Sequence, residues 1–354
     1  MNIVLDAYLD NNLGDDLMIK ILVKHFPQHE FFLYSNSSAV KNTFHGIENI
    51  TVKRIAERKL DFKKADAYVT IGGSRFQLVS LKQKFWRLNR LKQLSRLKRQ
   101  KIKIATIGSN FGPFSGKFAV KLAEWELRKN DLVTVRDKEA ADFLHQFKNV
   151  DNYHLADDIV YNLDSIYSRN YPQKSGLGIS AYRSIRAPEY NFENYKYLAA
   201  LADQYIRKTR KTVKLFAFDS ENENDVVAAL HIYDLAEEKD SYEIIPYLGA
   251  EEHFLQEFEA CERIVAIRFH SAVLADIFEI PFLPVAYSNK MSNFLNDRGY
   301  AGPVTELKDM NRDLCVDTLA ETIINGGELF SDFTYDHHNA SVHFDELEKI
   351  LNSK

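Results

Sequence analysis

The sequence predicts an α/β protein made of two successive, doubly wound domains. Its 354 residues exceed the length that one hydrophobic core usually fills, which favours two domains. Short apolar runs, typical of buried parallel strands, alternate with helical patterns along the chain. This alternation stops at residues 165–174, a polar stretch with the features of a linker, and then restarts. The chain therefore contains two series of strands and helices.

The first series begins with an apolar strand at 2–8, a turn rich in Asn, Asp and Gly at 9–16, and a helix at 17–26. Asp15 or Asp16 is well placed to cap that helix. A later strand, from residue 67, runs into the Gly72-Gly73 pair, which permits either a tight turn or the close approach of a ligand. The other strands are expected at 31–34, 50–55, 102–107, 131–136 and 150–158, and the other helices at 78–103, 118–127 and after a suitable cap, Asp137.

The second series repeats the pattern. Its strands are expected at 176–183, 212–218, 242–245, 263–267 and 282–287, and its helices at 195–209, 223–238, 251–260, 271–278, 319–324 and 341–351. The domains are therefore expected at residues 1–168 and 175–325, followed by a helical segment at 326–354. Two Rossmann-like domains facing each other across a cleft are the simplest architecture for these two series.

Composition excludes several classes of protein. The content of 45% apolar and 27% charged residues is that of an ordinary soluble globular protein, and a net charge of -4 argues against a nucleic-acid binder. Two cysteines, Cys261 and Cys315, cannot form a disulfide framework, and no Cys/His spacing suggests a metal site. Because the sequence also shows neither a signal peptide nor a long apolar run, we expect a cytoplasmic protein without a metal or cofactor.

The charge is unevenly distributed. No acidic residue occurs between Asp66 and Glu124, and the helix expected at 78–103 combines many lysines and arginines with apolar residues such as Phe85 and Trp86. Such a helix can make peripheral contact with an anionic membrane surface or bind a polyanionic substrate. It can equally be a solvated helix whose apolar side packs on the core, and both interpretations can hold at once.

The strand at 263–267 ends in Arg268 and His270, and a helix is expected to start at Ser271. A fixed cation, a titratable imidazole and a helix N-terminus at one point suit an anionic ligand. In the alternative, structural interpretation, Arg268 pairs with a carboxylate and His270 fills a core position.

Position along the strands favours the functional interpretation. Ligands of doubly wound sheets bind at the carboxyl ends of the strands. Arg136, Arg183 and Lys290, like Arg268 and His270, lie at the ends of expected strands.

Six short motifs occur in a characteristic order: Asn12-Leu-Gly-Asp-Asp16, Ile71-Gly-Gly-Ser74, the glycine-containing loop 108–113, Val135-Arg-Asp137, Arg268-Phe-His270 and Tyr287-Ser-Asn-Lys290. With these motifs the chain resembles the polysaccharide pyruvyl transferase family over nearly its whole length. The resemblance implies a fold similar to GT-B glycosyltransferases. It also implies transfer of a pyruvyl group from phosphoenolpyruvate onto two hydroxyls of a sugar, which forms a ketal and releases phosphate. The sugar would belong to a cell-surface polysaccharide or to its lipid-linked precursor.

The resemblance also implies a donor site formed by Arg136, Arg268, His270 and Lys290. This agrees with the chemistry of phosphoenolpyruvate, since guanidinium groups hold carboxylate and phosphate bidentately and a lysine adds a point charge. An imidazole can give or take the proton that ketal formation moves, and the sequence does not distinguish the two roles. The acceptor is expected on the N-terminal side of the cleft, near Asn12, Gly14, Asp15, Gly72, Gly73 and Asn110.

Two other functions remain open. A GT-B-type glycosyltransferase would share the fold, bind the diphosphate of a nucleotide sugar at the helix after His270, and use Asp276 or Glu279 for the ribose. A non-catalytic member of the family would bind a glycan or an anion. The joint presence of the four expected donor residues disfavours this last function.

Overall fold

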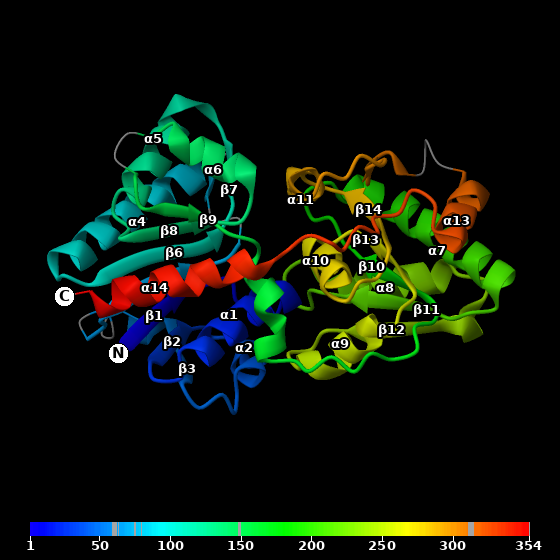
Figure 1. The fold of residues 1–354 in the computed structure, drawn as a ribbon, viewed down its shortest axis with the longest axis horizontal. Coiled ribbons are helices and arrows are strands. Elements are labelled where there is room, and N and C mark those ends of the chain that lie inside the picture. The colour runs from blue at the N-terminus through cyan, green and yellow to red at the C-terminus, as the bar shows by residue number, and fades with distance from the viewer. Residues whose placement is uncertain are drawn as a thin grey trace. The chain divides into compact units, whose positions relative to one another are not determined.

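The computed structural model describes residues 1–58, 62, 64–73, 76–78, 80–147, 150–310 and 315–353. The chain divides into two compact units (Figure 1). The N-terminal unit comprises Met1–Leu9, Asp15–Ile166 and Asp336–Lys354, and the C-terminal unit comprises Asp10–Gly14 and Tyr167–Tyr335. A short segment near the start of the chain thus belongs to the second unit, and the final segment belongs to the first.

The N-terminal unit is built on a parallel sheet with the strand order β3-β2-β1-β4-β6-β8-β9 in the described residues. Its strands are β1 (Asn2–Asp6), β2 (Glu30–Tyr34), β3 (Ile50–Lys53), β4 (Ala67–Ile71), β6 (Lys103–Ser109), β8 (Leu132–Val135) and β9 (Tyr153–Leu155). The order changes direction between β1 and β4, and such a switch point is where doubly wound sheets bind ligands. A separate parallel pair joins β5 (Phe76–Leu78) to β7 (Phe111–Phe114).

Helices cover this sheet: α1 (Leu13–His25), α2 (Ser38–Thr43), α4 (Leu81–Arg99), α5 (Gly116–Leu127), α6 (Lys138–His145) and α14 (Val342–Asn352). In Figure 1, α14 lies along β6, although more than two hundred residues separate them in the chain. Its His343 is fully buried and its Nδ1 lies 2.5 Å from Thr134 Oγ1 of β8, while its Nε2 lies 2.7 Å from the carbonyl oxygen of Asp157. The last helix is therefore an integral part of the first unit.

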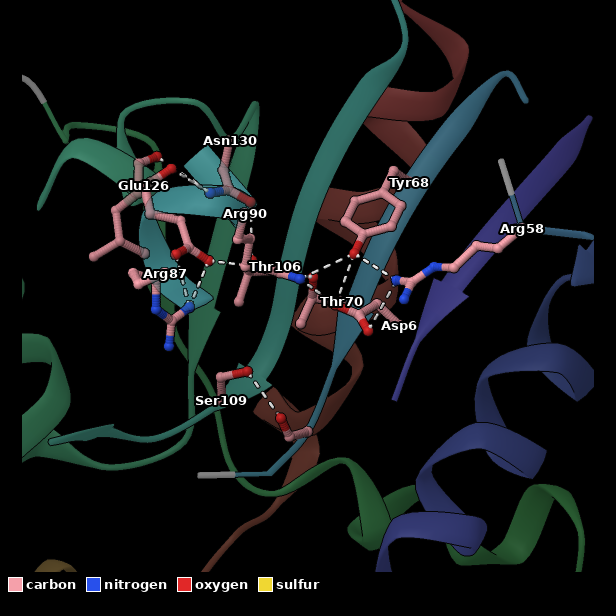
Figure 2. Close-up of polar contacts among 12 residues, drawn as sticks. Asp6, Arg58, Tyr68, Thr70, Arg87, Arg90, Thr106, Ser109, Glu126 and Asn130 are labelled. Atoms are coloured by element: carbon pink, nitrogen blue, oxygen red, sulfur yellow. Dashed lines mark hydrogen bonds and ion pairs between the residues drawn. The ribbon is translucent and has the colours of Figure 1, made fainter. Parts of the chain in front are cut away.

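The helix α4 turns two of its arginines inward (Figure 2). Arg87 and Arg90 both bind the buried carboxylate of Glu126, with Nη1–Oε2 and Nε–Oε1 distances of 2.7 and 2.6 Å. Arg90 also pairs with Asp6 and donates to the hydroxyl of Tyr68 at 2.9 Å. Part of the positive charge predicted for the surface of this helix thus serves the core of the unit.

The C-terminal unit is also built on a parallel sheet, with the order β12-β11-β10-β13-β14-β15 among the residues that the structure describes. Its strands are β10 (Leu177–Ala181), β11 (Val213–Ala217), β12 (Tyr242–Pro246), β13 (Arg263–Ala266), β14 (Phe282–Ala286) and β15 (Thr305–Glu306). Its helices are α7 (Asn191–Thr209), α8 (Asp225–Leu235), α9 (Glu251–Glu259), α10 (Phe269–Ile277), α11 (Asn289–Asp297) and α13 (Val316–Asn325). The switch point of this sheet lies between β10 and β13.

The predicted fold class is confirmed, but several helices start earlier than expected, and two of these, α1 and α10, carry predicted site residues. The helix α1 begins at Leu13, so Asp15 and Asp16 lie in its first turn and do not cap it. Carboxylates are favourable there because the helix dipole is positive at its N-terminus. The helix α10 begins at Phe269 instead of Ser271, which makes Arg268 the N-cap residue and puts His270 in the first turn.

Candidate functional site

Arg268 is held by carboxylates at the end of β13. Its Nε and Nη2 atoms donate to the two oxygens of Asp225 at 2.8 and 2.5 Å, and its Nη1 binds Glu223. The guanidinium also lies over the ring of Tyr182, 4.5 Å from its centroid. Arg268 therefore pairs with carboxylates in this structure, as the structural interpretation of this residue predicts.

The partners of Arg268 come from the loop after β11 and the first residue of α8, a segment without a predicted site residue. Asp219 organises this loop, because its Oδ1 accepts hydrogen bonds from the backbone of Glu221, Glu223 and Asn224. The sequence does contain a local signal, since every second residue from 219 to 225 is acidic and this segment directly follows an apolar strand. Its pairing with Arg268 is a tertiary contact, which no local pattern indicates.

The ionisation of Asp225 sets the charge of this loop. Burial raises the pKa of Asp225 to about 6, while the nearby charge of Arg268 acts in the opposite direction. When the acids of the loop, Asp219, Glu221, Glu223 and Asp225, are ionised, they outweigh the single charge of Arg268. Protonation of Asp225 would reduce this negative excess by one charge and so make the loop more favourable for an anion.

His270 is half-buried in the first turn of α10, and its ring packs directly against Gly14. A Cβ atom at Gly14 would lie 1.8 Å from Nδ1 of His270, so a larger residue cannot occupy this position without moving the ring. The side chain of Asn12 accepts from the backbone N–H of Gly14 at 3.2 Å and donates to Asp219 at 3.5 Å.

We call Asn12, Gly14, Asp219, Glu223, Asp225, Arg268 and His270 the histidine cluster. It lies at the switch point of the C-terminal sheet, since β13 pairs with β10 and the N–H of Arg268 donates to Ser180 Oγ of β10 at 3.0 Å. Three loops of one unit thus converge where this type of sheet binds ligands.

Lys290 lies in the first turn of α11, after the strand next to β13, and is half-buried. The preceding Tyr287 stacks on Tyr182, with ring centroids 4.3 Å apart, and Tyr182 in turn lies under Arg268. Lys290 therefore extends from the same edge of the sheet as the histidine cluster.

Arg136 belongs to the N-terminal unit, where it is buried among polar partners. Its Nη1 lies 2.5 Å from Asp158 Oδ2 and its Nε donates to Asn110 Oδ1 at 2.6 Å. The amide of Asn110 also binds Asp137, which caps α6 as predicted by accepting from the N–H of Ala140 at 2.7 Å. We call Asn110, Arg136, Asp137 and Asp158 the Arg136 network.

The glycine pair adjoins this network. Gly72 and Gly73 have φ values of 62° and 71°, and the N–H of Asn110 donates to the carbonyl oxygen of Gly73 at 3.4 Å. A Cβ atom at Gly72 would lie 3.7 Å from Asp15 Oδ1 and 2.4 Å from Met18 Cε. The expected acceptor residues of this unit are therefore neighbours. Ser74 of the same motif lies outside the described residues.

The predicted site residues thus form two groups, one in each unit. Asn12, Gly14, Arg268, His270 and Lys290 lie in the C-terminal unit, and Asp15, Gly72, Gly73, Asn110 and Arg136 lie in the N-terminal unit. Of the two acids considered for a ribose, Asp276 pairs with Arg298 at 3.1 Å in the interior, and Glu279 is largely exposed. Within the described ranges, no three His, Cys, Asp or Glu side chains are grouped so as to hold a metal ion.

Comparison with known protein families gives one match. The model of the family described as polysaccharide pyruvyl transferase matches residues 12–289. Nine of the ten predicted site residues lie in this range, and Lys290 directly follows it. A search of curated proteins found no match.

Solved structures of similar fold cover almost the whole chain. UDP-GlcNAc 2-epimerase from Methanocaldococcus jannaschii is 12% identical with a TM-score of 0.62, and the alignment covers 98% of this chain and 99% of that one. The Neisseria meningitidis enzyme bound to UDP-GlcNAc is also 12% identical, with a TM-score of 0.62 and 100% of both chains covered. HepE from Anabaena, in complex with UDP and glucose, is 13% identical with a TM-score of 0.57, over 99% and 96% of the two chains. These likenesses show the GT-B-like fold.

Proposed function

Because the chain belongs to the polysaccharide pyruvyl transferase family, we propose that it moves a pyruvyl group from phosphoenolpyruvate onto a sugar of a cell-surface polysaccharide or of its lipid-linked precursor. The observation that carries the proposal is the position of His270, in the first turn of α10 and packed against Gly14 at the switch point of the C-terminal sheet. This position puts a titratable imidazole beside the backbone N–H groups of a helix N-terminus, which favour an anionic substrate.

The proposed reaction forms two C–O bonds at C2 of phosphoenolpyruvate. One hydroxyl of the sugar adds to C2 while the methylene carbon takes up a proton, and the second hydroxyl then displaces phosphate. The two hydroxyls lose one proton each, and the new methyl group and the leaving phosphate gain one proton each. The reaction therefore balances without a redox partner or a cofactor. His270 transfers one of these protons, as acid to the methylene carbon or as base from the hydroxyl.

The donor has to compete with protein carboxylates for Arg268. Asp225 holds two guanidinium nitrogens from the interior, whereas Glu223 binds the third nitrogen and is about one fifth exposed. We propose that an anionic group of the donor replaces Glu223 on Nη1, with Lys290 binding the same substrate. The role predicted for Arg136 in donor binding is compatible with this proposal but is not required by it.

The acceptor hydroxyls are proposed to bind near Asp15, Gly72, Gly73 and Asn110 in the N-terminal unit. Gly72 and Gly73 are buried in this structure, and their positive φ values, 62° and 71°, form a tight turn beside Asp15. Asp15 is half-buried, and its carboxylate oxygens are of the kind that accepts hydrogen bonds from sugar hydroxyls. The side-chain amide of Asn110 binds Arg136 and Asp137, so a sugar would have to compete for it.

The test is turnover of phosphoenolpyruvate with a panel of lipid-linked and nitrophenyl glycosides. We expect release of phosphate together with the mass gain of a pyruvyl ketal on the acceptor. In His270→Asn this turnover should be lost while phosphoenolpyruvate still binds. The matched control is His253→Asn, because His253 is exposed on α9 and its replacement should leave the rate unchanged.

Turnover of a UDP-sugar without turnover of phosphoenolpyruvate would replace this proposal with the glycosyltransferase alternative. Binding of a glycan without turnover of either donor would favour the non-catalytic alternative.

A further inference from the structure

The outer face of α4 carries large apolar side chains that the fold does not bury. Leu81 is 84% exposed, Phe85 62% and Leu88 36%, and their helical spacing puts these three on one side of α4. Trp86, 61% exposed, lies on an adjoining side of the helix. The inner side of α4 supplies Leu94, Leu97 and the two buried arginines instead. The exposed residues therefore contribute little to the core, and a contiguous apolar surface of this kind usually marks an interaction site.

The neighbouring helix α5 extends this surface. It packs beside α4, where Lys84 Nζ donates to the carbonyl oxygen of Ser115 at 3.1 Å. Phe118 and Trp125 are both exposed on α5. We call the exposed residues of the two helices the α4–α5 face.

Lysines and arginines surround the apolar residues of this face. Lys82 lies over the ring of Trp86 and Lys121 over that of Trp125, with 5.0 and 5.8 Å to the centroids. Further exposed cations are Lys92, Arg96, Arg99 and Lys117. Neither α4 nor the segment 116–123 contains an acidic residue. Glu124, next to Trp125, is half-buried and paired with Arg128. The face therefore combines apolar insertion groups with a predominantly positive charge.

We propose that the α4–α5 face docks the protein on an anionic phospholipid membrane. Tryptophan, phenylalanine and leucine with flanking lysines is the composition of surfaces that lie in the membrane interface. Leu81 and Leu88 do not stack on bases, which disfavours nucleic acid. A second copy would bring like charges together, which disfavours a dimer through this face. Among the described residues we find no helix with the length and hydropathy of a membrane span, so the contact is peripheral.

The proposal can be tested without a label, because the two tryptophans of the chain, Trp86 and Trp125, both lie on this face. The full chain is mixed with phosphatidylcholine vesicles that contain, or lack, about one third phosphatidylglycerol. We expect co-sedimentation and a blue shift of tryptophan emission with the anionic vesicles alone. Both signals should weaken as salt is raised, since added ions screen the attraction.

Variants separate the two components of the face. Lys117→Gln/Lys121→Gln should weaken binding by about 25-fold, at about fivefold for each lysine near an anionic surface. Phe85→Ser/Leu81→Ser should weaken it by at least about tenfold, because each side chain loses its burial in the interface. The matched control is Phe192→Ser, which removes an exposed phenylalanine of the C-terminal unit and should change nothing.

Three outcomes would overturn the proposal. They are equal binding to both kinds of vesicle, binding that survives in the Phe85→Ser/Leu81→Ser protein, and a concentration-dependent dimer that Phe85→Ser abolishes. None of these outcomes depends on turnover of phosphoenolpyruvate, so the membrane contact and the proposed reaction can fail separately.

Discussion

Arg136 and Arg268 each follow a buried parallel strand, one in each unit, and each binds a carboxylate. Their surroundings nevertheless differ. Arg136 is enclosed, with a side chain 2% exposed and matched by Asp158 and Asn110, two strands away from the switch point of its sheet. Arg268 lies at a switch point, faces two carboxylates and precedes a half-buried histidine. An arginine at a strand end can therefore be a structural residue, which we call a brace, or part of a binding site. Its neighbouring residues determine which role it has.

The largest expected effect tests whether Arg136 is a brace. Arg136→Ala would leave the buried carboxylate of Asp158 without its cation, which typically costs about 3–5 kcal/mol. We expect a corresponding loss in the free energy of unfolding of the N-terminal unit, measured by urea denaturation. Arg136→Met/Asp158→Asn is the control, and it should recover much of the loss. If Arg136→Ala kept its stability and lost affinity for phosphoenolpyruvate, Arg136 would belong to the donor site.

The second effect is the loss of stability in acid, which should differ between the two units. Burial lowers the pKa of His343 in the N-terminal unit to about 4 from the usual 6.5. The unfolded chain therefore binds this proton first, and the unit loses about 3 kcal/mol as the pH falls from 6.5 to 4. In the C-terminal unit the raised pKa of Asp225 acts in the opposite sense, with a contribution that is complete at low pH and lost as the pH rises through about 6.

Hydrogen exchange measured between pH 7 and pH 4.5, with correction for the intrinsic rates, checks this prediction. Amides of the N-terminal sheet should lose protection in acid, and those of β10 and β13 should not. His343→Gln should reduce the acid sensitivity of the first unit. An equal loss of protection in both units would contradict the opposite effects expected from His343 and Asp225.

The third effect tests the contact that defines the histidine cluster. Gly14→Ala would force the ring of His270 to move, because the added Cβ atom would lie 1.8 Å from Nδ1. A displacement of about 1 Å at a reacting group can lower a rate by about 100-fold. We expect a fall of that order in the turnover of phosphoenolpyruvate with little change in melting temperature. Gly327→Ala is the control, since its Cβ atom would meet nothing within 4 Å. Unchanged turnover in Gly14→Ala would remove His270 from the chemistry.

The smallest effect sharpens the description of Arg268. Glu223→Gln removes one of the two carboxylates that compete with the donor, so affinity for phosphoenolpyruvate should rise by a few fold, or about 1 kcal/mol. Calorimetric titration measures the change, and Glu221→Gln is the control from the same loop. A loss of affinity would mean that Glu223 positions Arg268 for the donor instead of competing with it.

Much of the fold follows from local pattern. The apolar strands, the restart after residue 174 and the motif Arg268-Phe-His270 are all continuous in the chain, and they led to the correct fold class and family. The helix starts at Leu13 and Phe269 were missed because glycine, aspartate, phenylalanine and histidine are weak helix formers. Tertiary contacts override such preferences.

Partners across the fold were not predictable. Asp225 lies 43 residues before Arg268, and Glu126 lies 39 residues after Arg87. Local periodicity does not report contacts of this range. The basic composition of α4 thus indicated a cationic helix, but not that Arg87 and Arg90 face inward while Phe85 and Trp86 face outward.

The final helix has a consequence for how the protein is made. The first unit needs α14, whose His343 is buried against β8, yet residues 336–354 follow the whole of the second unit in the chain. On the ribosome the first unit can therefore start to fold early but can be completed only after the second unit has been synthesised. Cutting the chain after residue 166 would leave an incomplete protein, and a separate first unit would require residues 336–354 to be spliced back onto it.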